Sequence, residues 1–174
     1  KIASPDIIHK SDAGGVRLKI KTAGQARRAF KEITENAKKY KPNAHIKGIL
    51  VEQMARGGVE VILGSFRDPK FGPICMFGLG GIFVEALKDV TFRLAPMWKT
   101  SAENMIRSIK AYAVLKGIRG NPPTDIKAAE LCILRLSQMV SNHPEISELD
   151  INPLIIYPEG EGCVVADSRI LLSR

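Results

Sequence analysis

The stretch that decides the fold is VEVILGSFRDPKFGPICMFGLGG, residues 59–81. It holds two apolar runs, Val59–Phe66 and Pro73–Phe77, whose length and composition predict β-strands. The sequence ARGG at residues 55–58 precedes them and predicts a hairpin-type connection back to a further strand at Ile46–Gln53. The centre of the fold is therefore expected to be a β-sheet.

Helical patterns lie on both sides of these strands. Apolar side chains recur at helical spacing in residues 22–40 and again in residues 126–140, so each segment is expected to bury one face. The sequence TSAE at residues 100–103 has the form of a capping box, which predicts a helix from there to about Leu115. We expect these helices to pack on the sheet.

The end of the chain predicts a hairpin. Two segments, at about Ser147–Ile156 and Val164–Ile170, have the composition of strands, and the turn PEGEG at residues 158–162 joins them. Strands separated by helices and followed by a hairpin indicate an α/β (α+β) fold, with a mixed sheet and helices on one face. With 174 residues and a mass of 19.1 kDa, residues 1–174 are expected to form one domain.

The composition excludes several classes of protein. Apolar residues make up 45% of the chain and charged residues 25%, which is typical of a folded domain and not of a disordered one. The longest uncharged apolar run, residues 71–84, is too short and too rich in glycine to span a bilayer. No signal peptide is visible, and Cys75, Cys132 and Cys163 are far apart and in no CxxC pair. We therefore expect a reduced cytoplasmic protein without membrane contact, disulfide framework or zinc site.

The net charge of +8 comes from the first quarter of the chain. Residues 1–47 carry 12 Lys/Arg and 4 Asp/Glu, whereas residues 48–174 carry 14 of each. Such a region attracts phosphates, either of a nucleic acid or of a nucleotide. Aromatic residues do not interleave with the basic ones as a base-stacking surface requires, and KKYK at residues 38–41 suits the C-terminal end of a helix. We therefore expect no nucleic acid partner.

The loop HKSDAGGV, residues 9–16, is the first candidate site. Its paired glycines would let the backbone approach an anion closely, although an ordinary turn uses the same residues. The loop has neither the spacing of a P-loop nor that of a GxGxxG motif. His9, beside Lys10 and Asp12, is either a plain surface residue or a group that reacts near neutral pH.

A second candidate site combines a strand end with a glycine-rich bend. The sequence ILVEQM at residues 49–54 ends a predicted strand in a carboxylate, and Glu60 follows. Backbone groups at a strand end can pair with an adenine edge, and a carboxylate can accept hydrogen bonds from ribose hydroxyls. An ordinary hairpin with solvated acids explains the same pattern. The sequence FGLGGI at residues 77–82 either cradles phosphate or turns tightly within the core.

A third candidate site lies at the end of the chain, in ELDINP at residues 148–153. Alternate residues of a strand share a face, so Glu148, Asp150 and Asn152 are expected to point the same way. If the last two strands pair, Asp167 can join them. Hard oxygen ligands that converge in this way suit Mg²⁺ shared with substrate phosphates, whereas the alternative is an acidic surface strand.

Together these motifs resemble the ATP-grasp domain of ADP-forming acyl-CoA synthetases. The similarity covers essentially all 174 residues in order. It rests on SPDIIHKSDAGGV at residues 4–16, VEQM at 51–54, DPKFGP at 68–73, FGLGG at 77–81 and ELDINPL at 148–154. The family is similar to succinyl-CoA synthetase, and its domain has a further segment upstream of Lys1. The resemblance implies an ATP-grasp fold whose upstream part is missing from this chain.

The resemblance also implies a reaction, in which acyl-CoA, ADP and phosphate interconvert with the free acid, CoA and ATP. In this family the phosphate leaves an acyl phosphate for a histidine on the CoA-binding subunit and then passes to the nucleotide. His9 matches a second histidine that carries the phosphate, and Asp150 matches an acid that orients a phosphohistidine. Asn152 and Asp167 match the Mg²⁺ ligands. The residues expected to bind ATP or ADP are Lys1, Glu52, Gln53, Met54, Glu60, Gly80 and Gly81.

The implied partners are ADP or ATP, phosphate, and a CoA-binding α subunit or fused domain. A rival function is a ligand-sensing module, because similar domains are fused to protein acetyltransferases without phosphoryl transfer. The presence of His9, Asp150, Asn152 and Asp167 together favours the enzyme, since a sensor needs no phosphate carrier.

Overall fold

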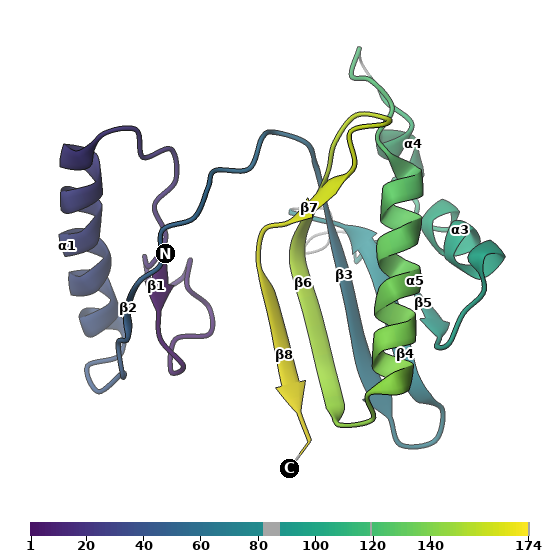
Figure 1. Ribbon diagram of the computed structural model, residues 1–174, viewed down its shortest axis with the longest axis horizontal. Helices are drawn as coiled ribbons and strands as arrows, with labels where there is room; N and C mark the ends of the chain where they lie inside the picture. Colours follow the sequence, from purple (N-terminus) through teal and green to yellow (C-terminus); the bar gives the residue numbers. More distant parts are fainter. Residues whose placement is uncertain (82–87, 119, 174) are drawn as a thin grey trace. The chain divides into compact units, whose positions relative to one another are not determined.

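The structure is a computed structural model that describes residues 1–81, 88–118 and 120–173. The chain divides into two compact units, Lys1–Met54 and Ala55–Arg174 (Figure 1). Each unit has its own hydrophobic core. In the described part of the chain, no helix is both long enough and apolar enough to cross a bilayer.

The first unit packs one helix against a short ladder. β1 (Ile2–Ala3) pairs antiparallel with β2 (Gly48–Ile49), and α1 (Ala23–Tyr40) confirms the helix predicted for residues 22–40. α1 begins at a capping box, because the Thr22 hydroxyl accepts from the Gln25 N–H at 3.2 Å and the Gln25 side chain accepts from the Thr22 N–H at 3.2 Å. The buried core of this unit consists of Ile2, Ile7, Ala13, Ile33 and Ala37.

The second unit is built on a six-stranded sheet in the order β5-β4-β3-β6-β7, with β8 also paired to β6. Its strands are β3 (Val59–Asp68), β4 (Gly72–Leu79), β5 (Val90–Leu94), β6 (Ile146–Ile156), β7 (Cys163–Val165) and β8 (Ser168–Leu172). β3 and β4 pair in unbroken register, so the two strands predicted from residues 59–81 are confirmed near the middle of the sheet. β6 pairs with β7 and β8, which confirms the predicted terminal hairpin.

Helices cover one face of this sheet. The helices are α3 (Lys99–Arg107), α4 (Tyr112–Leu115) and α5 (Ile126–Asn142), and α3 and α5 pack directly on the strands (Figure 1). The core between the layers includes Leu63, Phe77, Met105, Ile133 and Leu154, all of which are fully buried. On the opposite face, Phe66 and Phe92 pack edge to face with their ring centroids 6.3 Å apart.

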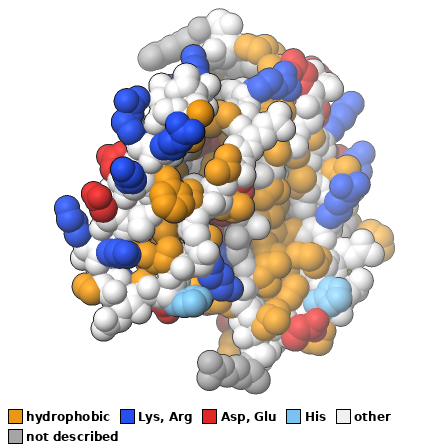
Figure 2. Space-filling view, turned by 60° about the vertical axis from the view of Figure 1, so that its left-hand side comes forward, with side chains coloured by type: hydrophobic (Ala, Val, Ile, Leu, Met, Phe, Trp, Pro, Cys, Tyr) orange, Lys and Arg blue, Asp and Glu red, His pale blue; other side chains and the backbone are white. Residues whose placement is uncertain are grey.

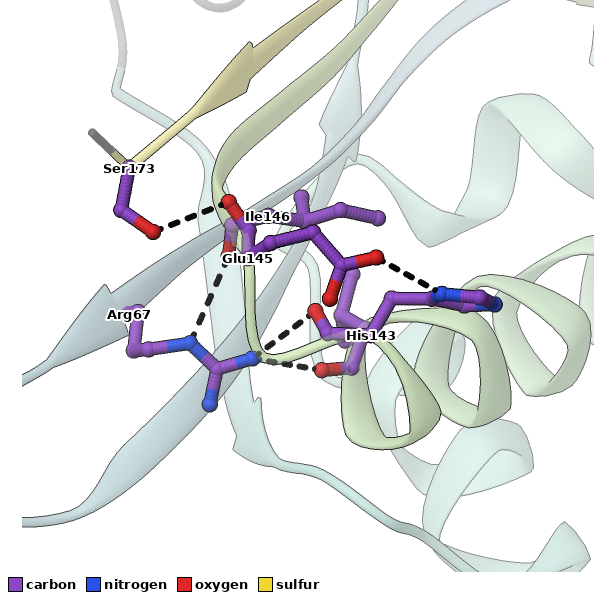
Figure 3. Close-up of polar contacts among 6 residues, drawn as sticks. Arg67, His143, Glu145, Ile146 and Ser173 are labelled. Atoms are coloured by element: carbon purple, nitrogen blue, oxygen red, sulfur yellow. Dashed lines mark hydrogen bonds and ion pairs between the residues drawn. The ribbon is translucent and has the colours of Figure 1, made fainter.

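Arg67 on β3 links the C-terminal end of α5 to the sheet through hydrogen bonds. The guanidinium Nη2 donates to the carbonyl of Val140 at 2.7 Å and to that of His143 at 3.3 Å, and Nε lies 3.4 Å from the carbonyl of Ile146 (Figure 3). The carbonyls of Val140 and His143 lie at the last turn and the C-cap of the helix, where backbone acceptors lack helical partners, and that of Ile146 lies at the start of β6. The arginine therefore satisfies them and places a positive charge at the negative end of the helix dipole.

The strand predicted at Ile46–Gln53 is mostly wrong. Only β2 forms there, and its partner is β1 at the start of the chain, not β3. The Leu50 N–H still donates to the Lys1 carbonyl at 2.7 Å, but beyond it residues 51–58 form no strand. Val51 is 86% exposed, so the apolar pattern there does not reflect burial within the first unit.

Four further details differ from the sequence prediction. α3 begins one residue before TSAE, with Trp98 at its N-cap and no side-chain capping bond, so the predicted capping box is wrong. The helix ends at Arg107, because the buried Asp89 carboxylate accepts from the N–H groups of Lys110 and Ala111 at 2.7 Å each and fixes a turn there. Every strand pairing in the described residues is antiparallel, whereas a mixed sheet with parallel and antiparallel pairs was expected. The strand β5 was not predicted. Residues 82–84 of the apolar run lie outside the described residues.

Candidate functional site

His9 lies on a surface turn of the first unit. Its side chain is exposed, whereas Ile7 before it and Ala13 after it are buried in the core of the unit. The His9 carbonyl accepts a hydrogen bond from the Ala13 N–H at 3.3 Å, which closes the turn. The imidazole is therefore presented to solvent from a segment that is anchored on both sides.

Gly14 and Gly15 complete this turn. The Gly14 N–H donates to the Ser11 carbonyl at 2.9 Å, and the Gly15 N–H donates to the Lys10 carbonyl at 2.8 Å. A Cβ on Gly15 would lie 2.6 Å from Ile2 Cγ2, so a side chain there would clash with the core. The two amides are thus engaged within the turn, which favours the turn over the anion cradle as the reason for the glycine pair.

Lys1 and Glu52 meet in the first unit. Lys1 Nζ lies 2.7 Å from Glu52 Oε2, and the side chain of Lys1 is only 14% exposed. Gln53 and Met54 follow with exposed side chains, in a segment without regular structure. Two members of the predicted nucleotide-binding set are therefore in direct contact, although Glu52 does not stand at a strand end as expected.

Asn152 and Asp167 lie side by side at a break in the β6 ladder. At this point β6 carries one residue more than its neighbour β3, so the register shifts. The other neighbour is interrupted there too, because β7 has ended and β8 has not begun. The Asn152 N–H donates to the Asp167 carbonyl at 3.1 Å across the gap. Breaks of this kind re-aim side chains out of the regular alternation of a sheet, and they recur beside active sites.

Asp150 lies just before this break. Its neighbour Leu149 is buried under the helices, so Asp150 points to the opposite face, where it pairs in register with Gly64 and Arg169. A Cβ on Gly64 would lie 4.0 Å from Asp150 Oδ1, which means that the carboxylate sits over this glycine. Burial raises the pKa of Asp150 above its ordinary value, while the charge of Arg169 lowers it and that of Asp167 raises it.

Glu60 and Gly80 lie opposite each other at the end of the β3–β4 ladder that is nearer to the break in β6. The Gly80 N–H donates to the Glu60 carbonyl at 2.7 Å, and a Cβ on Gly80 would lie 2.9 Å from that oxygen. This bond extends the β3–β4 ladder by one pair, and it leaves both sequence interpretations of the bend, a phosphate cradle and a tight turn, as predictions. The Glu60 side chain is exposed, and Gly81 has a φ of 63°. Val61 pairs with Leu154, so these residues lie near the break in β6.

Arg169 is a residue of this face that the sequence patterns did not single out. It pairs in register with Asp150, and its Nη2 lies 3.6 Å from Glu148 Oε2. No other described strand position on this face holds a lysine or arginine. The sequence could have indicated Arg169, because it lies two residues after Asp167 and alternate residues of an extended segment share a face.

The surface of the first unit is basic, as the charge count of residues 1–47 predicts. Figure 2 shows Lys and Arg side chains spread over the surface that is turned forward, with fewer acidic ones between them. An apolar groove of about 530 Å³ also opens on this unit. Its lining consists of Ala26, Arg27, Arg28, Phe30, Lys31, Ile49 and Val51. None of the predicted nucleotide-binding residues lines this groove.

Curated relatives match nearly the whole chain. A 4-hydroxybutyrate–CoA ligase (ADP-forming) of Nitrosopumilus maritimus is 53% identical over 170 residues, which are 98% of this chain and 24% of the relative. Subunit β of an acetate–CoA ligase (ADP-forming) I of Pyrococcus furiosus is 51% identical over 172 residues, which are 99% of this chain and 73% of the subunit. The chain thus spans about a quarter of one relative and about three quarters of the other.

Two solved structures of one enzyme also match nearly the whole chain. Acetyl-coenzyme A synthetase 1 of Ca. Korarchaeum cryptofilum, described as dinucleotide-forming, was solved with coenzyme A, Ca-AMPCP and HgCl⁺. It has a TM-score of 0.96 and 48% identity, and the match covers 99% of this chain and 75% of that chain. A second structure, with coenzyme A and Mg-AMPPCP, has a phosphohistidine segment that points towards the nucleotide-binding site, with a TM-score of 0.85, 45% identity and coverage of 99% and 75%.

The family match extends over the same length. Residues 1–172 match the family described as the ATP-grasp domain, which takes in both units and every residue predicted for the site. The expected fold is therefore confirmed by the family match and by the solved neighbours. This chain belongs to the ATP-grasp family.

Proposed function

We propose that this chain is the nucleotide-binding part of an ADP-forming acyl-CoA synthetase, which interconverts acyl-CoA, ADP and phosphate with the free acid, CoA and ATP. The observation that carries the proposal is the pairing of Asn152 with Asp167 at the break in β6, together with an exposed His9 on an anchored turn. Relatives with about half of their aligned residues identical are ADP-forming ligases, which favours an enzyme over a ligand-sensing module.

His9 carries the phosphoryl group in this reaction. A ring nitrogen of the neutral imidazole attacks the phosphorus of a phosphohistidine on the CoA-binding partner, so that one P–N bond forms while the other breaks. A β-phosphate oxygen of ADP then attacks the same phosphorus, and the bond to His9 breaks to leave ATP and a free imidazole. The surface position of His9 supports this role, because a carrier has to meet two groups in succession.

Asn152 and Asp167 would hold Mg²⁺. Their side chains offer amide and carboxylate oxygens, which Mg²⁺ prefers, and a site of two protein ligands leaves positions for water and phosphate oxygens. When bound, Mg²⁺ offsets the negative charge of the phosphates during transfer.

The remaining site residues position the nucleotide and the carrier. Asp150 accepts a hydrogen bond from the ring of a phosphohistidine and so orients it, while Arg169 beside it contacts phosphate oxygens. Lys1 binds a phosphate, and its ion pair with Glu52 holds the ammonium group in place until the nucleotide arrives. The nucleotide contacts comprise Glu52, Gln53 and Met54 at the adenine, Glu60 at the ribose, and Gly80 and Gly81 near the phosphates.

The reaction requires a CoA-binding α subunit or a fused domain, which selects the acyl group. The separate β subunit of Pyrococcus and the longer ligase chain of Nitrosopumilus support both arrangements. We place the enzyme in the cytoplasm, where CoA and nucleotides meet, in agreement with the three free thiols of the chain.

Labelled phosphate tests the proposal. Full-length protein with its CoA-binding partner is supplied with acyl-CoA and radiolabelled phosphate, and acid-labile label on this chain is followed with and without ADP. His9→Asn should abolish both this label and ATP formation, while the phosphohistidine of the partner still forms. His45→Asn is the matched control, because His45 is an exposed histidine of the same unit. Near-normal ATP formation by His9→Asn would show that the phosphate passes directly from the partner to ADP.

A further inference from the structure

Two cysteines that are distant in sequence meet in the second unit. Cys132 on α5 and Cys163 on β7 are separated by 31 positions, yet their Sγ atoms lie 3.4 Å apart. Both side chains are half-buried at the edge of the main core, and all three cysteines of the chain are free thiols in this structure. The sequence alone predicts no disulfide, because only the pairing of β7 with β6 and the packing of α5 bring the two thiols together.

The geometry points to a reversible disulfide at this position. A disulfide has an S–S length of about 2.05 Å, so closing the gap from 3.4 Å requires an approach of about 1.4 Å. The two side chains already face each other from two regular elements. We propose that Cys132 and Cys163 form a modification site that a low-molecular-weight disulfide oxidises to an intramolecular bond and that a thiol reduces again.

The reaction balances as two thiol–disulfide exchanges. One cysteine thiolate attacks the small disulfide, forms a mixed disulfide and releases one small thiol. The second cysteine loses its proton and attacks the protein sulfur of the mixed disulfide, so that the protein disulfide forms and a second small thiol leaves. The protein thus loses two electrons and two protons, and one small disulfide becomes two thiols.

Cys75 and a metal site are the two obvious alternatives, and the structure disfavours both. Cys75 is fully buried in the core, so a reagent in solution cannot readily reach it. A metal held by Cys132 and Cys163 would need further protein ligands, but no third His, Cys, Asp or Glu completes a cluster among the described residues.

Burial, the neighbouring Cys132 thiol and the charge of Asp125 raise the pKa of Cys163 to about 12, while the charge of Arg135 lowers it. Because the thiolate is the attacking form, oxidation is expected to be slow near pH 7 and to accelerate as the pH rises. The bond would close a ring over residues 132–163, which contains β6 with Asp150 and Asn152. It therefore constrains the strand that carries part of the proposed site.

Peptide mapping tests the proposal. Full-length protein with its partner is incubated with oxidised glutathione at pH 8.5, free thiols are alkylated, and the protein is digested with trypsin without reduction. Cleavage after Lys127, Arg135 and Arg169 places the two cysteines in separate peptides, residues 128–135 and 136–169. We expect these two peptides to be joined by a bond that dithiothreitol breaks.

Variants identify the bond and show that it fits the native fold. Cys75→Ser should still give the linked pair, whereas Cys132→Ser should give no linked pair. Oxidised protein should melt on the order of 5 °C higher than reduced protein, and Cys132→Ser should lose this difference. Cys132 and Cys163 recovered only as alkylated thiols or as separate glutathione adducts would overturn the proposal, and so would a melting temperature that falls on oxidation.

Discussion

The two units support their site residues in different ways. The first unit has five buried core residues and a ladder of two residue pairs, and its candidate carrier His9 is exposed on a turn. The second has eighteen buried core residues among those described, and its candidate metal ligands lie on the long strand β6 and in the short gap between β7 and β8. The proposed carrier His9 therefore belongs to the unit with the small core, and the proposed metal ligands belong to the unit with the large core.

This difference follows what each group has to do. A carrier that meets two reaction partners gains from a surface turn, whereas a metal site needs ligands that are held at fixed distances by rigid elements. The buried residues that flank His9 keep its turn attached to the first unit without burying the ring. The first unit should accordingly unfold more easily than the second. The second unit should hold the distances between its site residues more strictly.

The largest effect is expected from core truncation. Phe77→Ala should lower the unfolding free energy of the second unit by about 3–5 kcal/mol, and Ile33→Ala that of the first by about 2–3 kcal/mol. The first loss is larger because truncating Phe77 removes more buried side-chain volume than truncating Ile33. Hydrogen exchange of the full-length protein, read peptide by peptide, should show each loss confined to its own unit. Equal loss of protection in both units from either variant would mean that they unfold as one body.

Arg67 provides the next test, on the second unit. Arg67→Ala should cost about 2–3 kcal/mol, because two backbone carbonyls at the end of α5 and one at the start of β6 lose a charged donor. Arg67→Lys keeps the charge but not the fork of donors, so it should recover only part of the loss. Urea denaturation measures both, and an unchanged midpoint for Arg67→Ala would show that water replaces the guanidinium.

Arg169 tests the chemistry of the second unit. Arg169→Ala should slow ATP formation at least about tenfold, which is the expected effect of removing one charged contact to phosphate. Glu148→Gln removes the ion-pair partner of Arg169 but leaves the cation in place, so it should retain activity. Steady-state kinetics with varied ADP and phosphate measures the effect. Equal losses in the two variants would indicate that Arg169 serves only its ion pair.

The smallest effect is expected at a helix cap of the first unit. Thr22→Ala should cost about 1 kcal/mol, because the hydroxyl that accepts from Gln25 is lost. Thr100→Ala is the matched control in the second unit, because the N-cap position of α3 is Trp98 and the Thr100 hydroxyl makes no capping bond. This control should change the free energy of unfolding by less than about 0.5 kcal/mol. Thermal melts compare the two, and a larger loss from Thr100→Ala would restore the capping box predicted from TSAE.

Local patterns predicted most of the second unit but less of the first. The apolar spacing of α1 and α5 and the runs of β3, β4 and β6 reflect burial, so the sequence could reveal them. β2 was misjudged because its partner β1 comes from far away in the sequence, and local composition carries no information about that partner. The extra residue in β6, the position of Arg169 opposite Asp150 and the meeting of Cys132 with Cys163 depend on register, which only the folded chain defines.

The division between carrier and metal site is tested most directly by one experiment on Asp167→Asn. The full-length enzyme with its partner is first given acyl-CoA and labelled phosphate without ADP, and then ADP and Mg²⁺ are added for a single turnover. The variant should accept label on His9 as the wild type does but pass it to ADP at least about a hundredfold more slowly. Transfer to ADP at the wild-type rate would show that Asp167 does not hold Mg²⁺ for this step.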